Sequence, residues 1–174
     1  MLNVQGDEPE LHPDVLDRLV ARFRSSPPAG AVLPRIGTIA ARFADDGLAE
    51  GAGSPADPNR VKVVLDHVGN ALYFSRSLIP FPRSSAGRID RPSRWLLHLG
   101  VYAFRADVLR LITTPGKLPR GGLEETESLE QLRWLHAGLP IAVAMVDHAF
   151  TGVDTPEDYA AFVGRHRASV PAFQ

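Results

Sequence analysis

The sequence predicts a layered α/β domain with a partly parallel sheet, and three observations lead to this prediction. Short apolar runs typical of strands alternate along the chain with segments whose apolar residues recur at helical spacing. A β-hairpin interrupts this alternation at residues 61–76. Hydrophobic residues make up 44% of the 174 residues, enough to fill one core. We therefore interpret residues 1–174 as a single domain.

The helices are predicted from apolar residues that recur at intervals of three and four. The predicted helices cover residues 14–25, 106–112, 124–136 and 155–166. Pro13 suits the first turn of the first helix, and Gly138 is a suitable stop after the third. Thr155 and Asp158 have the spacing of a capping box at the start of the last helix.

The strands are predicted from short apolar or β-branched runs bounded by turn residues. The predicted strands cover residues 31–33, 38–43, 61–65, 71–75, 96–104 and 141–146. Gly69 and Asn70 lie in the turn of the hairpin. Residues 45–59 are rich in Gly, Asp and Pro and predict a loop or a marginal helix, and residues 77–94 predict an exposed connection.

Composition excludes several classes of protein. The net charge of -1 gives no electrostatic basis for binding nucleic acid. The absence of cysteine excludes disulfides and thiolate metal sites. The apolar runs are too short to span a bilayer, and the N-terminus does not resemble a signal peptide. We therefore expect a cytoplasmic protein.

Two acidic residues are placed to meet at one edge of the sheet. Asp7 follows an apolar stub, and Asp154 follows the strand predicted at 141–146. Ligands of open α/β sheets collect beyond the carboxyl ends of the strands. Two aspartates together with substrate phosphates would satisfy Mg²⁺, which prefers oxygen ligands. A structural alternative stays open for each residue, because Asp7 suits a turn and Asp154 suits a helix start.

Cationic and aromatic residues form a second candidate set: Arg76, Arg83, His98 and Tyr102. Arg76 ends the return strand of the hairpin, where an apolar residue is more usual. His98 and Tyr102 are four apart on an extended segment, so they face the same side of the sheet. Guanidinium groups bind carboxylates and phosphates, so the set favours an acidic, hydroxylated ligand. The alternatives are a solvated charge for Arg83 and a satisfied core histidine for His98.

A third candidate pair, Glu130 and Gln131, lies on the predicted helix 124–136 beside an acidic face. Most such acidic faces are solvated or favour a helix N-terminus, so physical reasoning alone does not select Glu130 over its neighbours. The sequence contains no glycine-rich phosphate loop, dinucleotide fingerprint or nucleophile elbow. The residues alone thus predict an α/β domain with a carboxylate metal site beside an Arg/His/Tyr pocket.

Six sequence blocks in a consistent order resemble one family. The blocks are residues 3–9 (NVQGDEP), 61–66 (VKVVLD), 71–76 (ALYFSR), 98–102 (HLGVY), 127–133 (ESLEQLR) and 152–158 (GVDTPED). Together they resemble the 3-deoxy-manno-octulosonate cytidylyltransferases, also called CMP-Kdo synthetases. The ordered set is far more specific than any single block, and it spans nearly the whole chain.

The resemblance implies a Rossmann-like nucleotide-diphospho-sugar transferase fold and a Mg²⁺-dependent reaction. That reaction converts CTP and the sugar acid Kdo into CMP-Kdo and pyrophosphate for lipopolysaccharide biosynthesis. The resemblance makes Asp7 and Asp154 catalytic, magnesium-binding residues. It also implies a homodimer, with residues 77–95 as a contributor. The residues implied to line the sugar-acid pocket are Gln5, Arg76, Arg83, His98, Tyr102, Glu130 and Gln131.

The opening of the sequence leads to one more expectation. Residues 2–4 are typical of the end of a buried strand, and the family's preceding strand and Arg- and Lys-bearing triphosphate loop have no match in this sequence. We therefore expect the C-terminal part of a cytidylyltransferase, lacking the N-terminal nucleotide-binding segment and poorly stable or inactive alone. An inactive remnant, a cytidylyltransferase for another acidic sugar and a purely structural α/β module are the alternatives.

Overall fold

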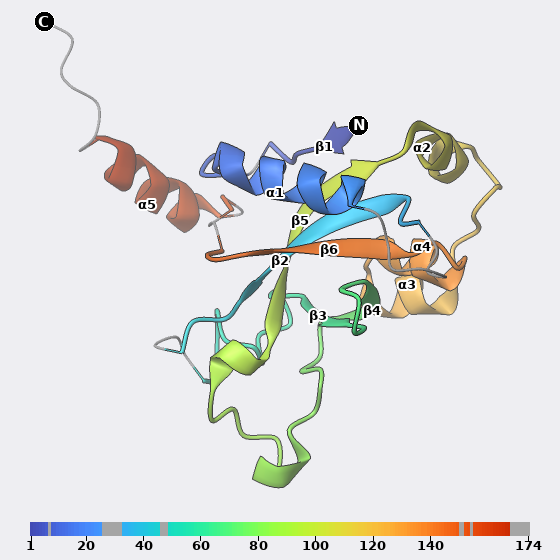
Figure 1. The fold of residues 1–174 in the computed structure, drawn as a ribbon. Coiled ribbons are helices and arrows are strands. Elements are labelled where there is room, and N and C mark those ends of the chain that lie inside the picture. Colours follow the sequence, from blue (N-terminus) through green and yellow to red (C-terminus); the bar gives the residue numbers. More distant parts are fainter. Residues whose placement is uncertain (7, 26–32, 46–48, 150–151, 154, 168–174) are drawn as a thin grey trace, which may run out of the picture.

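The structure is a computed structural model that describes residues 1–6, 8–25, 33–45, 49–149, 152–153 and 155–167. Figure 1 shows its elements along the chain. In order they are β1 (Leu2–Asn3), α1 (Pro13–Arg24), β2 (Ile36–Arg42), β3 (Lys62–Leu65), β4 (Ala71–Ser75), the 3-10 turns η1 (Arg83–Ser85) and η2 (Pro92–Arg94), β5 (Leu96–Phe104), α2 (Ala106–Thr113), α3 (Gly122–Glu127), α4 (Gln131–His136), β6 (Ile141–Val146) and α5 (Pro156–Arg167).

One mixed sheet organises these elements, in the order β4-β3-β5-β2-β6 with β1 paired to β5. β2 is parallel to β6 and antiparallel to β5, while β3 and β4 form the predicted hairpin. The inserted hairpin and the partly parallel sheet confirm the predicted α/β class. Helices of the described part of the chain are all too short or too polar to meet the requirements of a membrane span.

Two short strands share one edge of β5. β1 pairs with β5 at Tyr102 and Ala103, whereas β3 pairs with it at Leu97. The stretch of β5 around Gly100 lies between these two ladders. A ligand-sized opening can form there because neither neighbouring strand occupies that edge.

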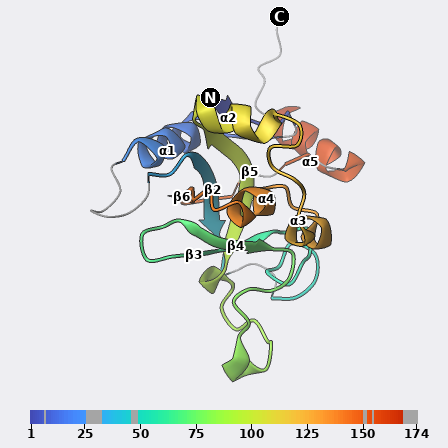
Figure 2. The same cartoon turned by 90° about the vertical axis from the view of Figure 1, so that its right-hand side faces the viewer.

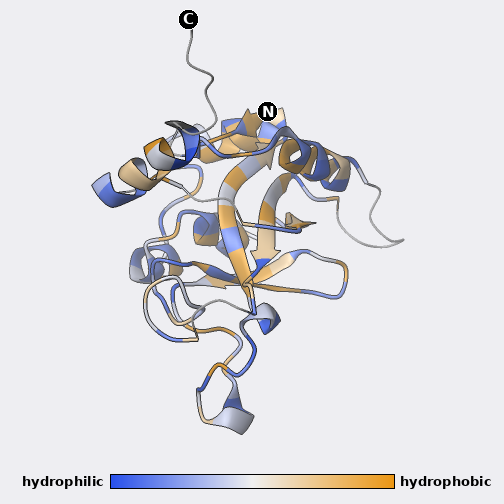
Figure 3. Cartoon of the chain, turned by 90° about the vertical axis from the view of Figure 1, so that its left-hand side faces the viewer, coloured by the Kyte–Doolittle hydropathy of each residue, from blue (hydrophilic) through white to orange (hydrophobic). Residues whose placement is uncertain are grey.

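Helices cover both faces of the sheet. α1 packs on β2 and β6, and a Cβ at Gly37 would come within 3.1 Å of the Leu19 side chain, so this glycine permits the close approach. On the opposite face, Val108 of α2 and Leu132 and Trp134 of α4 enter a second core cluster. Figures 1 and 2 show α2, α3 and α4 on the same side of the molecule. Figure 3 shows that hydrophobic residues are concentrated on the strands between these layers.

The predicted helix over residues 124–136 is wrong as a single element. α3 ends at Glu127, Ser128 adopts a left-handed φ of 53°, and α4 begins at Gln131. The last carbonyls of a helix have no partner inside the helix. At the end of α3 the carbonyls of Glu127 and Ser128 accept hydrogen bonds from Arg76, at 2.7 and 3.4 Å. This long-range contact favours a break where helical spacing alone predicts continuity.

Local signals at the other boundaries are mostly confirmed. The Asp158 amide donates to Thr155 Oγ1 at 3.1 Å and the Thr155 amide donates to Asp158 Oδ2 at 3.0 Å, which is the predicted capping box. Gly138 takes a φ of 74° after α4. β2 starts two residues before its predicted start, because its pairing with β6 begins at Ile36. Of the strand predicted at 31–33, only Leu33 lies within the described residues, and it is not in a strand.

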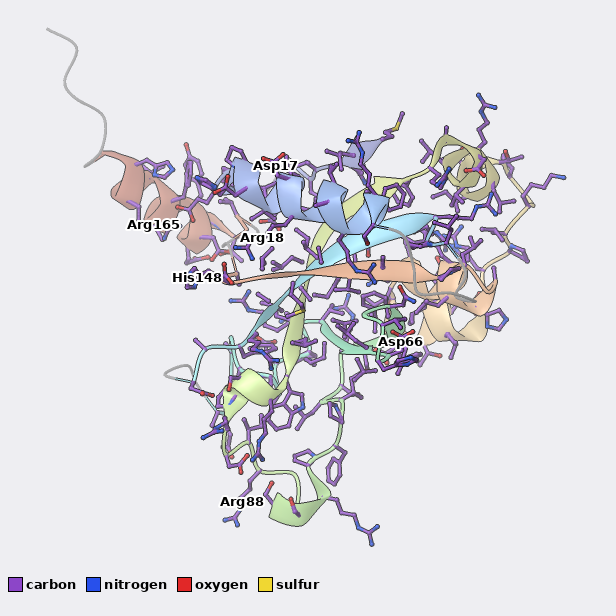
Figure 4. The ribbon with its side chains drawn as sticks, in the orientation of Figure 1. Asp17, Arg18, Asp66, Arg88, His148 and Arg165 are labelled. Carbon is purple, nitrogen blue, oxygen red and sulfur yellow. The ribbon has the colours of Figure 1, made fainter. Side chains whose placement is uncertain are left out.

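Residues 77–95 form an arm that projects from the sheet, as predicted for an exposed connection (Figure 1). Trp95 anchors its base, because the ring is buried and Nε1 donates to the Pro80 carbonyl at 3.0 Å. Figure 4 shows Arg88 at the far end of the arm. The arm therefore carries Arg88 away from the sheet.

A buried ion pair fastens α3 to α4 and yields a testable prediction. Arg133 donates to both oxygens of Glu124 at 2.8 and 2.6 Å, and the Glu124 side chain is 6% exposed. We expect Arg133→Met to lower the free energy of unfolding by about 3 kcal/mol, because it leaves a buried carboxylate without its main partner. Urea denaturation measures this loss. The control is Arg120→Met, since Arg120 is 70% exposed and 3.7 Å from the same carboxylate, and a comparable loss there would contradict the assignment.

Candidate sugar-acid pocket

A pocket of about 700 Å³ opens at the divided edge of β5. Its floor includes Gly100, between the ladder to β1 and the ladder to β3. Six residues singled out in the sequence line it together: Gln5, Arg76, His98, Tyr102, Glu130 and Gln131. These residues come from the loop after β1, from the position that follows β4, from β5, from the break between α3 and α4, and from the first residue of α4. The tertiary structure thus gathers side chains that lie up to 126 positions apart, from residue 5 to residue 131.

The other three predicted site residues are not placed in this pocket. Arg83 is exposed on η1, in the projecting arm, and does not line the pocket. Asp7 and Asp154 lie outside the described residues. The roles of all three residues therefore stay predictions.

Arg76 is held in place by main-chain carbonyls. Its Nε donates to Glu127 O at 2.7 Å, one terminal nitrogen to Pro58 O at 3.1 Å and the other to Ser128 O at 3.4 Å. A guanidinium has five N–H groups, so two remain for a ligand. Within the described part of the chain the Arg76 guanidinium forms no ion pair with a carboxylate. This arrangement suits an anionic ligand.

The Glu127 carboxylate stabilises the backbone that carries Arg76. Its Oε2 accepts from the Arg76 amide at 2.8 Å, and its Oε1 accepts from the Ser75 hydroxyl at 2.5 Å. Hydrogen bonds to an ionised carboxylate are stronger than neutral ones. The end of β4 and the end of α3 are therefore joined through one side chain, and the backbone that carries Arg76 is fixed.

Lys62 is a second anchor and is completely buried. Its ammonium donates to the carbonyls of Asp57, Arg60 and Arg76 at 2.8, 2.6 and 2.6 Å. Burial lowers the pKa of Lys62 to about 8, with the carboxylates of Asp57 and Glu127 opposing that shift. The three bonds tie the loop before β3 to the end of β4, where the pocket has its rim.

His98 and Tyr102 form the inner wall of the pocket with neighbouring aromatic rings. His98 lies edge-on to Phe74 at 4.8 Å, and Tyr102 lies edge-on to Trp134 at 5.2 Å. Burial lowers the pKa of His98 to about 3, so its ring is neutral at pH 7. Burial, with a smaller contribution from the Glu130 carboxylate, raises the pKa of Tyr102, so its hydroxyl keeps its proton. The wall is apolar but presents uncharged hydrogen-bonding groups.

Several pocket residues were missed by reasoning from the sequence. Asn3, Glu8, Asn59 and Ser128 also line the pocket. No local pattern singles out Asn3 or Asn59, because their position depends on the meeting of distant loops. Glu8 did carry a signal, since it adjoins Asp7 in the acidic loop.

The loop after β1 and the last helix are drawn together at the carboxyl ends of the parallel strands. Arg165 of α5 donates to both oxygens of Glu10, each at 2.9 Å. A second cavity of about 410 Å³ lies between the start of α1 and the end of β6, lined by Glu10, Arg18 and His148 among others. Figure 4 shows Arg18, His148 and Arg165 on this side of the molecule. The loop that follows β1 therefore lies close to the end of β6 and to the C-terminal part of α5.

The family of the chain follows from comparison with known proteins. A family model described as cytidylyltransferase matches residues 1–141. The chain belongs to the cytidylyltransferase family.

Curated cytidylyltransferases from bacteria and a plant are similar to the chain along most of its length. The 3-deoxy-manno-octulosonate cytidylyltransferase of Porphyromonas gingivalis is 42% identical over 164 residues, which cover 91% of this chain and 58% of that protein. The mitochondrial enzyme of that name from Arabidopsis thaliana is 37% identical over 158 residues, covering 91% of this chain and 49% of that protein. The chain thus spans between about half and three-fifths of these relatives.

A solved structure shares the fold of this cytidylyltransferase chain. CMP:2-keto-3-deoxy-manno-octonic acid synthetase, in complex with CTP, superposes with a TM-score of 0.77 at 35% identity. The match covers 97% of this chain and 62% of that one. This likeness confirms the predicted Rossmann-like nucleotidyltransferase fold.

Proposed function

We propose that the chain forms the sugar-acid part of an active site that transfers CMP from CTP to Kdo, giving CMP-Kdo and pyrophosphate. The observation that carries this proposal is the pocket at the divided edge of β5, where the Arg76 guanidinium, which forms no ion pair among the described residues, lies with other hydrogen-bonding side chains. The family membership and the names of the relatives support the cytidylyl group and the sugar acid as substrates. The use of the product in lipopolysaccharide assembly stays a prediction from the resemblance.

Each part of the pocket has a role in the proposed reaction. The two remaining N–H groups of Arg76 would hold the carboxylate of the sugar acid. Gln5, Glu130 and Gln131 would bind hydroxyls at the rim, while the wall of His98 and Tyr102 would fix the ring. A hydroxyl of the bound sugar attacks the α-phosphorus of CTP, the bond to the β-phosphate oxygen breaks, and pyrophosphate leaves. Positioning of the attacking oxygen is the contribution of these side chains.

Asp7 and Asp154 are proposed to hold Mg²⁺ for this reaction. The Glu10–Arg165 ion pair supports the proposal, because it brings together the loop after β1 and the helix that follows Asp154. Carboxylate oxygens fit Mg²⁺, which needs few protein ligands when phosphates supply the rest. Among the described residues no group of three acidic or histidine side chains could hold a metal, so the proposed site depends on these two aspartates. When bound, the ion would neutralise charge on the phosphates.

The test measures ligand binding and catalysis separately. Isothermal titration of the chain with Kdo reports whether the pocket binds the sugar acid. Pyrophosphate release with CTP, Kdo and Mg²⁺ reports transfer. We expect saturable Kdo binding by the chain alone. We expect pyrophosphate release that depends on both substrates, and is lost in Asp7→Asn, in a version extended by the N-terminal segment that holds the family's triphosphate loop. A folded chain that binds another acidic sugar but not Kdo would reassign the substrate, and one that binds no sugar acid would overturn the proposal.

A further inference from the structure

Thr38 occupies an irregular point in the sheet directly behind the pocket wall. It is fully buried in β2. The register between β2 and β5 shifts here, because Thr38 pairs with Tyr102 while Ile39 pairs with Leu99. Two residues of β5, Gly100 and Val101, are therefore extra, and a bulge of this kind leaves main-chain groups outside the regular ladder.

The Thr38 hydroxyl compensates for this irregularity. Its Oγ1 lies 2.8 Å from Val101 O and 3.3 Å from Leu99 O, and 3.0 Å from His98 Nε2. Both carbonyl oxygens are acceptors only, and a hydroxyl has a single proton. The shorter contact, to Val101 O, takes that proton. Oγ1 must then accept a hydrogen bond from His98 Nε2, because an unprotonated Nε2 would face an oxygen lone pair.

We infer that Thr38 is a positioning residue that holds His98 as the Nε2–H tautomer and makes Nδ1 the acceptor that the pocket offers to a ligand hydroxyl. The second ring nitrogen of a neutral histidine is an acceptor when the first carries the proton. No described residue donates a hydrogen bond to His98 Nδ1. Nδ1 is also absent from the set of buried side-chain polar atoms without a partner, so this nitrogen is not buried. Nδ1 is therefore accessible on a residue that lines the pocket.

The tautomer of His98 determines which ligand groups this part of the pocket can bind. A carboxylate has no proton to donate, so it would be disfavoured at Nδ1, whereas a sugar hydroxyl would be bound there. Arg76, on the other hand, offers only N–H donors and suits the carboxylate. If the proposed function is right, the two residues orient a sugar acid by holding its two kinds of oxygen at different points.

The tautomer is tested first without ligand, so this result does not depend on the proposed function. Long-range ¹H–¹⁵N spectra of ¹⁵N-histidine-labelled chain give both ring nitrogen shifts, and His98→Gln assigns the signals of His98 among the 6 histidines. We expect one neutral Nε2–H form in the wild type and in Thr38→Ser, which keeps the hydroxyl. In Thr38→Val the Nδ1–H form is expected to appear. A wild-type Nδ1–H form, or a Thr38→Val spectrum identical to the wild type, would overturn the inference.

Kdo titration then tests the acceptor. We expect the His98 Nδ1 shift to move on binding, and Thr38→Val to weaken Kdo binding about tenfold, the equivalent of one hydrogen bond, with Thr38→Ser close to wild type. An Nδ1 shift unmoved by bound Kdo would overturn the acceptor role. Absence of Kdo binding to a wild type with the expected tautomer would instead contradict the proposed function and leave the role of Thr38 in the tautomer supported.

Discussion

Replacing Lys62 by methionine is expected to lower the free energy of unfolding by about 2–3 kcal/mol at pH 7, because three partly buried carbonyls lose their donor while the side-chain volume is kept. Those carbonyls belong to Asp57, Arg60 and Arg76. The cost is less than the sum of three hydrogen bonds, since the variant no longer buries a charge. Urea denaturation of both proteins measures the difference.

The wild type and Lys62→Met should also differ in how their free energy of unfolding depends on pH. The pKa of Lys62 is lowered from 10.5 to about 8 by burial, so between these values the unfolded chain binds more protons than the folded one. The stability of the wild type therefore rises with pH across this window, while Lys62→Met lacks the titrating group. We expect the gap between the two proteins to widen by about 2 kcal/mol from pH 7 to pH 10. A gap that stays constant or narrows would contradict the lowered pKa.

The composition of the chain provides a matched control. Lys62 and Lys117 are its two lysines, and Lys117 is exposed. Lys117→Met should change neither the stability at pH 7 nor its pH dependence measurably. An amine-reactive label followed by mass spectrometry should modify Lys117 in the folded protein and spare Lys62. Rapid labelling of both would show that Lys62 is not held as the structure describes.

Arg76→Lys is expected to weaken Kdo binding by about 100-fold, because a lysine cannot reproduce a planar fork anchored on carbonyls and directed at a carboxylate. The dissociation constant comes from isothermal titration, and thermal unfolding identifies any general loss of structure. A Kdo analogue without the carboxylate distinguishes binding of the carboxylate by Arg76 from an effect of Arg76 on the shape of the pocket. The analogue should bind wild type and variant equally, whereas an equal loss for both ligands would show that Arg76 shapes the pocket rather than binds the carboxylate.

Arg83→Lys tests the second arginine of the predicted pocket set in the same experiment. Arg83 lies exposed in the arm and outside the pocket, so within one chain its replacement should change the Kdo dissociation constant less than twofold. An effect as large as that of Arg76→Lys would contradict this expectation. It would place Arg83 in the binding site, as the family resemblance implies.

Most of the fold was predictable because its determinants are local. The β-branched run before Gly69 and the apolar run after it specify the hairpin, and Thr155 with Asp158 specifies the start of α5. Of the six pocket residues, Arg76, His98 and Tyr102 were selected from residue type and spacing, whereas Gln5, Glu130 and Gln131 were selected only through the motif blocks. Glu130 illustrates this, since nothing local separates it from the other acidic residues of its segment.

The sequence by itself determined the α/β class, the hairpin insertion and the chemical character of the pocket, because periodicity, turn residues and residue type are written along the chain. Only the tertiary structure decided that a helix breaks at Ser128, that Lys62 is an internal anchor and that Thr38 lies behind His98, 60 positions away. Each of these features depends on a hydrogen bond between segments that are distant in the sequence. Such bonds depend on which carbonyls and hydroxyls the folded backbone brings together, and no local pattern records that.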